Sequence, residues 1–127
     1  MEPYHSSSTP KTPLLKFDAA SGTFEMSGKS IPENTAGFYK PLIDWLDRYS
    51  ENPAAATTLN IQLDYFNTSS SKSIMEILKR LERLEKSGKS KVLVNWLYDE
   101  NDEDIQETGE DYKSLVPVSF QLVPIKK

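Results

Sequence analysis

Four consecutive hydroxyl side chains stand between an amide and a lysine in the middle of this sequence. The run reads Asn67, Thr68, Ser69, Ser70, Ser71 and Lys72. An apolar, strand-like segment ends just before it, and a helix with an apolar stripe begins just after it. At a helix start, a hydroxyl or amide side chain caps free backbone N–H groups. The same N–H groups and the positive end of the helix dipole also favour a phosphoryl group there. The run is therefore open to two interpretations, helix capping and phosphorylation.

Two details favour a phosphorylation site over capping alone. Capping would explain one or two hydroxyls, whereas four occur in a row. No acidic residue lies between Phe66 and Met75, although acids commonly occupy a first helical turn, and Lys72 makes the junction mildly positive. A phosphate would bring a charge of about −1.5 to −2 onto free amides and a nearby ammonium group. These residues favour a phosphorylated hydroxyl in the run without selecting which one.

The sequence contains few residues that could act as catalytic groups. General acid–base and nucleophilic catalysis need an activated group beside a base. The sequence has no cysteine, and its single histidine, His5, lies in a Ser/Thr/Pro-rich segment without apolar periodicity. Thr68 or Ser69 could act as a nucleophile only beside Lys72 or Asp64. We therefore expect a protein that is not an enzyme and needs no cofactor, with a small hydrolase using Thr68 or Asp64 as an alternative.

The charged residues argue against metal and nucleic-acid binding. The stretch 99–111 holds eight carboxylates, but it lacks the glycine and the bidentate glutamate of a calcium loop. We interpret its first half as the solvated start of a helix. The net charge of −4 argues against nucleic acid as a partner. No apolar run is long enough to cross a membrane, and no signal peptide is visible, so we expect a cytoplasmic location and no membrane association.

The chain length of 127 residues fits a single domain. Residues 1–12, which include Ser6, Ser7, Ser8 and Thr9, have the composition of a disordered tail and give no indication of a role of their own. The domain is then residues 13–127. Short apolar runs at 14–17 and 23–27, joined by a loop ending in glycine, predict a β-hairpin.

Hydrophobic periodicity assigns the remaining elements. Apolar residues at helical spacing predict a helix over about 38–49, which either starts near Pro41 or is kinked there. Alternation predicts a strand at 58–66, and a second stripe predicts a helix ending at 87–88. A strand at 91–98, a third helix burying Ile105, Tyr112 and Leu115, and a final strand at 118–123 follow. The order β-β-α-β-α-β-α-β predicts an α/β fold with a mixed five-stranded sheet. We expect the last three strands, which are linked through helices, to be parallel neighbours, and the hairpin to supply an antiparallel or mixed edge.

Residues 12–125 resemble the SiaC family of bacterial regulatory phosphoproteins. The resemblance rests on residues 32–34 (Pro-Glu-Asn), 43–45 (Ile-Asp-Trp), 65–70 (Tyr-Phe-Asn-Thr-Ser-Ser) with Lys72, 75–78 (Met-Glu-Ile-Leu) and 96–99 (Trp-Leu-Tyr-Asp). It implies a single domain similar to STAS domains, the anti-sigma-factor antagonists. Those antagonists usually read Asp-Ser-Ser-Gly at the junction, whereas this chain reads Asn-Thr-Ser-Ser. The chain is thus more similar to SiaC, and a STAS-type anti-sigma-factor antagonist is a further alternative.

The resemblance also implies a function and assigns the site. It implies that Thr68 is phosphorylated by a dedicated protein kinase and dephosphorylated by a PP2C-like phosphatase. Ser69, Ser70 and Lys72 would then shape the surroundings of the phosphate, and Asn67 would fix the turn. The unphosphorylated form would bind and activate a diguanylate cyclase, which raises cyclic-di-GMP and promotes biofilm formation.

Overall fold

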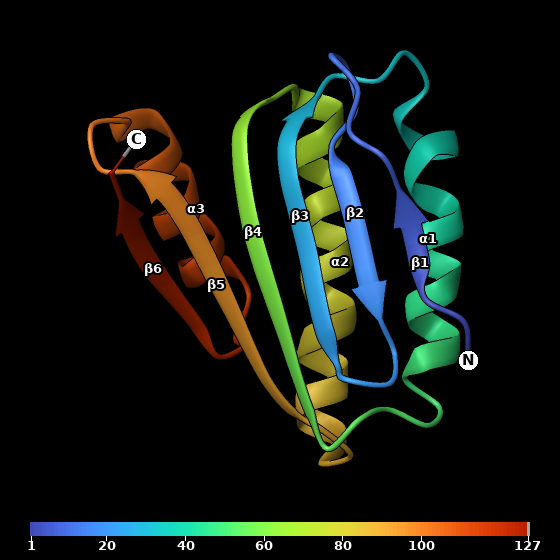
Figure 1. Cartoon of the computed structure of the whole chain (residues 1–127). Helices are drawn as coiled ribbons and strands as arrows, with labels where there is room; N and C mark the ends of the chain where they lie inside the picture. Colours follow the sequence, from blue (N-terminus) through green and yellow to red (C-terminus); the bar gives the residue numbers. More distant parts are fainter. Residues whose placement is uncertain (127) are drawn as a thin grey trace.

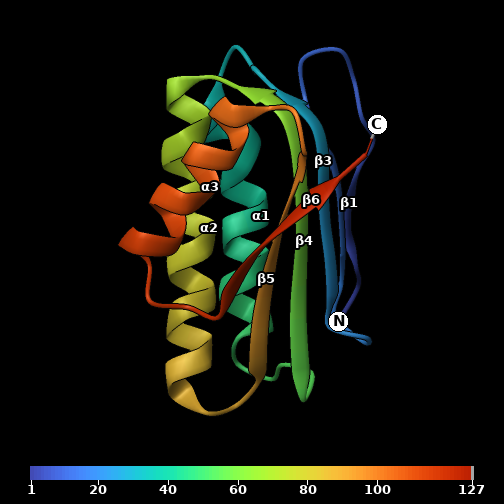
Figure 2. The same ribbon diagram turned by 90° about the vertical axis from the view of Figure 1, so that its left-hand side faces the viewer.

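A computed structural model describes residues 1–126 of the chain; Lys127, the last residue of the domain expected from the sequence, lies outside the described residues. One six-stranded sheet forms one layer, and three helices cover one of its faces (Figures 1 and 2). The strands, in their spatial order, are β1 (Tyr4–Ser6), β2 (Leu14–Asp18), β3 (Thr23–Ser30), β4 (Ala56–Phe66), β5 (Lys91–Asp99) and β6 (Phe120–Ile125). The helices are α1 (Thr35–Tyr49), α2 (Thr68–Ser87) and α3 (Glu103–Leu115). The predicted α/β fold with helices packed on a mixed sheet is confirmed.

The predicted strand count of five is wrong, because the segment expected to be a disordered tail contributes β1. Residues Tyr4–Ser6 pair antiparallel with β2. The backbone carbonyl of Glu2 also accepts a hydrogen bond of 2.9 Å from the Trp45 indole N–H on α1. Strand pairing uses main-chain groups, which β2 would otherwise present unpaired at the sheet edge. A short polar strand of this kind leaves no periodicity in the sequence.

The strand pairing agrees with the prediction for the hairpin and for the last three strands, and it adds a parallel pair between β3 and β4. β2 and β3 form the expected antiparallel hairpin, while β3, β4, β5 and β6 are successive parallel neighbours. Parallel strands joined through helices end at the same edge of the sheet, so α1, α2 and α3 all begin there. This edge, at the top of Figure 1, carries the Asn67–Lys72 run.

The apolar stripes of the helices form the core, with one difference from the sequence-based expectation. α1 begins at Thr35 and runs through Pro41, which is exposed, so of the two alternatives for this helix the start near Pro41 is wrong. α2 buries its predicted stripe of Ile74, Ile77, Leu78, Leu81 and Leu84. On α3, Tyr112 is buried as predicted, but Leu115 is 67% exposed. Leu115 is exposed because α3 and α2 leave a groove between them at this point.

Candidate functional site

Asn67 is the N-cap of α2 and fixes the turn between β4 and the helix, as expected. Its side-chain oxygen Oδ1 accepts hydrogen bonds from the Ser70 backbone N–H at 2.9 Å and from the Ser69 hydroxyl at 3.2 Å. Its own N–H donates to the Ser30 carbonyl at the end of β3. The helix start is therefore tied to the neighbouring strand as well as capped.

Ser70 does not face the surface where a phosphate would lie, in contrast to the sequence-based expectation. Its side chain is fully buried, and its hydroxyl donates to the Ser30 carbonyl at 2.9 Å. The same oxygen lies 2.8 Å from the Ser30 hydroxyl, which lies 2.6 Å from the Tyr39 hydroxyl on α1. Burial raises the pKa of Tyr39 to about 12, so this phenol stays protonated at neutral pH. Ser70 thus joins α2, β3 and α1 inside the protein.

The hydroxyls of Ser69 and Ser71 also have partners. Ser69 lies at the surface, and its hydroxyl is 2.8 Å from that of Thr35, which joins the first turns of α2 and α1. Neither helix has an acidic residue in its first turn. The Ser71 hydroxyl donates to the Thr68 backbone carbonyl at 2.7 Å. Two helix N-termini, both free of acidic side chains in their first turns, therefore lie side by side at this edge.

Thr68 is the member of the run whose side chain is left open. It is the first residue of α2, it is exposed, and its hydroxyl has no hydrogen-bond partner within residues 1–126. Neither its own N–H nor that of Ser69 donates a hydrogen bond within residues 1–126, as expected at a helix start. Lys72 follows one turn later on the same face, exposed and without an ion pair in the described part of the chain. A phosphate on Thr68 would therefore meet free N–H groups, the helix dipole and an ammonium group.

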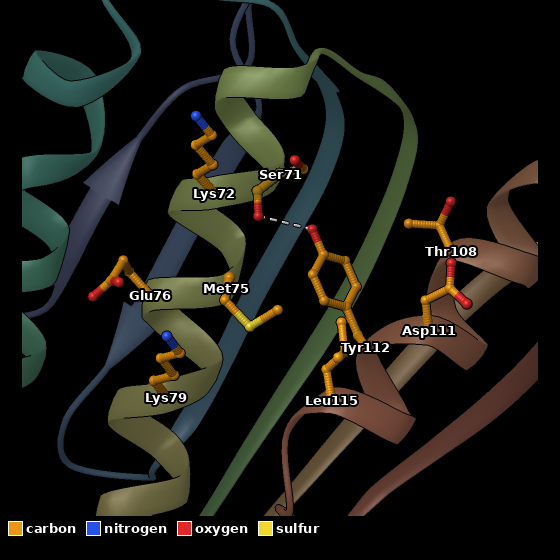
Figure 3. Close-up of a pocket in the computed structure, with 9 residues that line it drawn as sticks. All are labelled: Ser71, Lys72, Met75, Glu76, Lys79, Thr108, Asp111, Tyr112 and Leu115. Atoms are coloured by element: carbon orange, nitrogen blue, oxygen red, sulfur yellow. Dashed lines mark hydrogen bonds between the residues drawn. The ribbon is translucent and has the colours of Figure 1, made fainter.

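A groove of about 530 Å³ follows Thr68 along α2 and separates this helix from α3 (Figure 3). Its lining from α2 consists of Ser71, Lys72, Met75, Glu76 and Lys79, and its lining from α3 consists of Thr108, Asp111, Tyr112 and Leu115. The Tyr112 hydroxyl donates a hydrogen bond of 2.9 Å to the Ser71 carbonyl and closes the floor. Sequence reasoning missed this groove. The sequence pattern that could have revealed it is a helix face with residues at spacings of three and four: Thr68, Lys72, Met75 and Lys79.

The other residues singled out from the sequence lie apart from the Thr68 hydroxyl. Asp64 lines a separate hollow beside β4 that also contains Asp102 and Asp104. Asp102 caps α3 through a hydrogen bond of 3.1 Å from the Ile105 N–H, so the acidic stretch is the helix start that the sequence predicted. His5 is an exposed residue of β1.

Two further kinds of feature are absent from residues 1–126. No group of three or more histidine, aspartate or glutamate side chains in this range is arranged to hold a metal ion. No helix in the same range combines the length and the apolar character needed to cross a membrane.

Comparison with known proteins gives one consistent relationship. The model of the SiaC family of regulatory phosphoproteins matches residues 6–125. An uncharacterized protein of Pseudomonas aeruginosa (strain UCBPP-PA14) is 34% identical over 122 residues, which cover 96% of each chain. The crystal structure of apo-SiaC from P. aeruginosa superposes with a TM-score of 0.88 at 31% identity, covering 97% of this chain and 99% of that one.

A second solved structure contains a partner. It is diguanylate cyclase SiaD in complex with its activator SiaC, from P. aeruginosa, and matches with a TM-score of 0.89 at 31% identity, covering 96% of this chain and 99% of that one. The family match and the full-length structural similarity agree in extent and fold. The chain therefore belongs to the SiaC family of regulatory phosphoproteins.

Proposed function

We propose that this protein is a phosphorylation-controlled partner switch whose modified residue is Thr68. A cognate protein kinase phosphorylates Thr68, and a PP2C-like phosphatase removes the phosphate. The unphosphorylated form binds and activates a diguanylate cyclase and so raises cyclic-di-GMP, which favours biofilm formation. The protein itself catalyses no reaction in this scheme.

The open hydroxyl of Thr68 carries the proposal. Ser69, Ser70 and Ser71 use their hydroxyls in hydrogen bonds to Thr35, Ser30 and the Thr68 carbonyl. A kinase must bring the accepting oxygen to its own catalytic base and to the γ-phosphate of ATP. Within the run, Thr68 offers its oxygen without breaking an existing contact, and it does so at an exposed helix start. The cyclase partner is supported by the relative that is described as the activator of SiaD.

The local charges give the switch a physical basis. A phosphate on Thr68 adds about −1.5 to −2 charge at an exposed position. The buried Ser70 hydroxyl keeps its hydrogen bonds to Ser30, because it does not contact that position. The fold can therefore tolerate the phosphate, while the charge of the surface around the first turn of α2 changes from positive to negative. A partner that binds this surface would meet a repelling charge that must also lose its water.

Intact-mass spectrometry tests the modification. Wild type, Thr68→Ala and the matched control Ser69→Ala are each incubated with the cognate kinase and ATP. We expect one phosphate on wild type and Ser69→Ala and none on Thr68→Ala. Equal phosphorylation of Thr68→Ala would overturn the assignment. Subsequent treatment with the phosphatase should return the wild-type mass.

A cyclase assay tests the output and separates the alternatives. The cyclase from the same organism that is most similar to SiaD is assayed for cyclic-di-GMP formation with unphosphorylated and phosphorylated protein. Stimulation by the unphosphorylated form alone is expected. Binding to an anti-sigma factor instead, with no effect on the cyclase, would favour the STAS-type antagonist. The hydrolase alternative has the disadvantage that no side chain in the described part of the chain hydrogen-bonds the Thr68 hydroxyl to activate it.

A further inference from the structure

β6 forms one edge of the sheet, and its outer side pairs with no other strand within residues 1–126. Figure 1 shows β6 at the end of the strand order, and in Figure 2 the same edge faces the viewer. On its inner side, β6 pairs in parallel with β5. An edge strand presents a row of N–H and C=O groups that can pair with a further strand. β6 is therefore a place where the sheet can continue.

The pairing with β5 identifies the backbone groups of β6 that point outward. The carbonyls of Ser119 and Ile125 accept hydrogen bonds of 2.8 and 2.9 Å from β5 and from the turn that follows it. Alternate residues of a strand direct their backbone groups to opposite sides, so Phe120, Leu122 and Pro124 direct theirs away from β5. Pro124 lies at an outward position, where its missing N–H takes no hydrogen bond from the ladder.

The two edges of the sheet differ in their protection against strand pairing. Natural proteins protect an edge strand by keeping it short or by placing charged side chains on it. At the opposite edge, β1 is only three residues long. β6 is six residues long, and its sequence Phe-Gln-Leu-Val-Pro-Ile contains no charged side chain. Only Pro124 interrupts its row of outward donors, so Phe120 and Leu122 keep N–H groups that another strand can bind.

The outward groups of β6 are complementary to those of a second, antiparallel β6. When Leu122 lies opposite Leu122 of the second copy, the N–H of each bonds the carbonyl of the other. The Phe120 N–H of each copy then meets the Pro124 carbonyl of the other. Every outward N–H is satisfied in this register, and the proline costs only one carbonyl per copy its partner. A register with Gln121 opposite Gln121 would draw in Val118, which lies in a bend before the strand.

The side chains beside this edge on the open face of the sheet also suit a second β6. Val123 pairs with Leu97 of β5, and both are half-buried on the face that carries no helix. The Gln121 side-chain amide donates to Asn95 Oδ1 at 2.7 Å, and the Asn95 amide donates to Asn60 Oδ1 at 2.9 Å. In the antiparallel pair, Val123 of each copy lies opposite Gln121 of the other. The pairing therefore buries Val123 further without breaking the row of amide hydrogen bonds.

We propose that β6 is a self-association edge, through which two copies of this chain pair their β6 strands antiparallel and form a symmetric dimer with one continuous sheet. The two-fold axis is perpendicular to the sheet, so the helices of both copies lie on the same face. The interface consists of a single strand pair, which makes the dimer weak and dependent on protein concentration. Thr68 begins α2, which does not lie at this edge, so the inference does not depend on the proposed function.

The charge of α3 gives the association a defined salt dependence. This helix packs over the edge, with Gly109 facing Leu122 of β6. Its sequence contains five acidic residues and one lysine. In the dimer the two α3 helices lie on either side of the β6 pair, where their like charges repel each other. Added salt screens this repulsion, so we expect the dimer to strengthen with salt.

Sedimentation velocity tests the dimer with four forms of the full chain: wild type, Gln121→Lys, Val123→Lys and Gln62→Lys. Gln121→Lys and Val123→Lys place a cation in the strand pair, and the two-fold axis brings the lysines of the two copies together. Gln62→Lys is the matched control, because it makes the same replacement on the same face of the sheet in the interior strand β4. Thermal unfolding verifies that each variant is folded. Amide hydrogen exchange, followed by NMR at several protein concentrations, gives a second measurement.

We expect wild type and Gln62→Lys to dimerise equally at protein concentrations up to about 1 mM, and both β6 variants to dimerise ~10-fold more weakly. Exchange of the Phe120 and Leu122 amides should slow as the wild-type concentration rises. Exchange of the Gln121 and Val123 amides, which point toward β5, should change little.

Three results would overturn the proposal. One is a wild type that stays monomeric up to about 1 mM, with Phe120 and Leu122 amides whose exchange is independent of concentration. Another is a dimer that both β6 variants leave intact or that weakens with salt, because another surface then holds it together. The third is protection of these two amides only after another protein is added, which would assign the edge to a strand of that protein.

Discussion

The side-chain oxygens of Ser30 and Ser70 lie 2.8 Å apart in the interior, forty positions apart in the chain. Ser30 ends β3 and Ser70 belongs to the first turn of α2. Through this contact and the neighbouring Tyr39 hydroxyl, the start of α2 is fixed to the sheet and to α1. The position of Thr68, two residues earlier, depends on this buried set of hydroxyls.

Replacing Ser70 by alanine should destabilise the protein. The change removes one of the two donors to the Ser30 carbonyl, which keeps the Asn67 N–H, and leaves the Ser30 hydroxyl with fewer partners in a dry environment, at a cost of about 1–3 kcal/mol. Denaturant unfolding measures the loss. Thr68→Ala is the control, because the exposed Thr68 hydroxyl has no partner to lose, and it should stay within about 0.5 kcal/mol of wild type. Equal stability of the two variants would contradict the structural role of Ser70.

Replacing Thr68 by aspartate should change stability and partner binding in opposite directions. A negative charge at the first residue of α2 interacts favourably with the helix dipole, by about 0.3–1 kcal/mol. The same charge should weaken cyclase binding relative to Thr68→Ala, although less than a phosphate does because it carries a smaller charge. Unfolding and binding measurements on the same preparations test both directions. Tighter cyclase binding by Thr68→Asp than by Thr68→Ala would count against a switch at this residue.

High pH should unfold the protein through its buried tyrosines. Burial raises the pKa of Tyr39 to about 12 from the unfolded value of 10.0, and it also raises the pKa of Tyr112. A raised pKa in the folded state means that the associated stability is fully present below about pH 10. This stability is lost as the pH rises from about 10 through about 12.

Tyr39→Phe separates this effect from other alkaline changes. The variant keeps the buried ring but has no phenol to ionise, so its free energy of unfolding should fall less steeply than that of wild type between about pH 10 and 12. Below about pH 9 it should be less stable than wild type by about 0.5–1.5 kcal/mol, because it loses the hydrogen bond to Ser30. Identical slopes for the two proteins would show that Tyr39 does not titrate in this range.

Replacing Gly109 by alanine should destabilise the protein even though alanine favours helices. Gly109 lies on the buried face of α3, and an added Cβ would come within 2.5 Å of Trp96 Nε1 and 2.7 Å of Leu122 Cδ2. Overpacking of this kind costs about 1–3 kcal/mol, which exceeds the gain in helix propensity. Ser114→Ala, at an exposed position of the same helix, should be neutral or slightly stabilising. A neutral Gly109→Ala would mean that α3 can move away from the sheet.

The sequence by itself determined the elements and most of their pairing. Spacing of apolar residues identified α2 and its buried stripe, and alternation identified β4, because burial of one face imposes these periods. The helices between β4, β5 and β6 required parallel neighbours. Asn67 could be assigned as a cap, because capping is a local interaction between a side chain and the next turn.

Only the tertiary structure decided which hydroxyl of the run is open. Successive helix residues turn by about 100°, so Thr68, Ser69 and Ser70 point in different directions. Which of them faces the interior depends on where β3 and α1 lie, and no local pattern encodes that. The same holds for β1, which exists through backbone pairing with β2, and for Leu115, which the helical period predicts as buried. Its exposure, and with it the groove beside Thr68, follows from how α3 sits against α2 and the sheet.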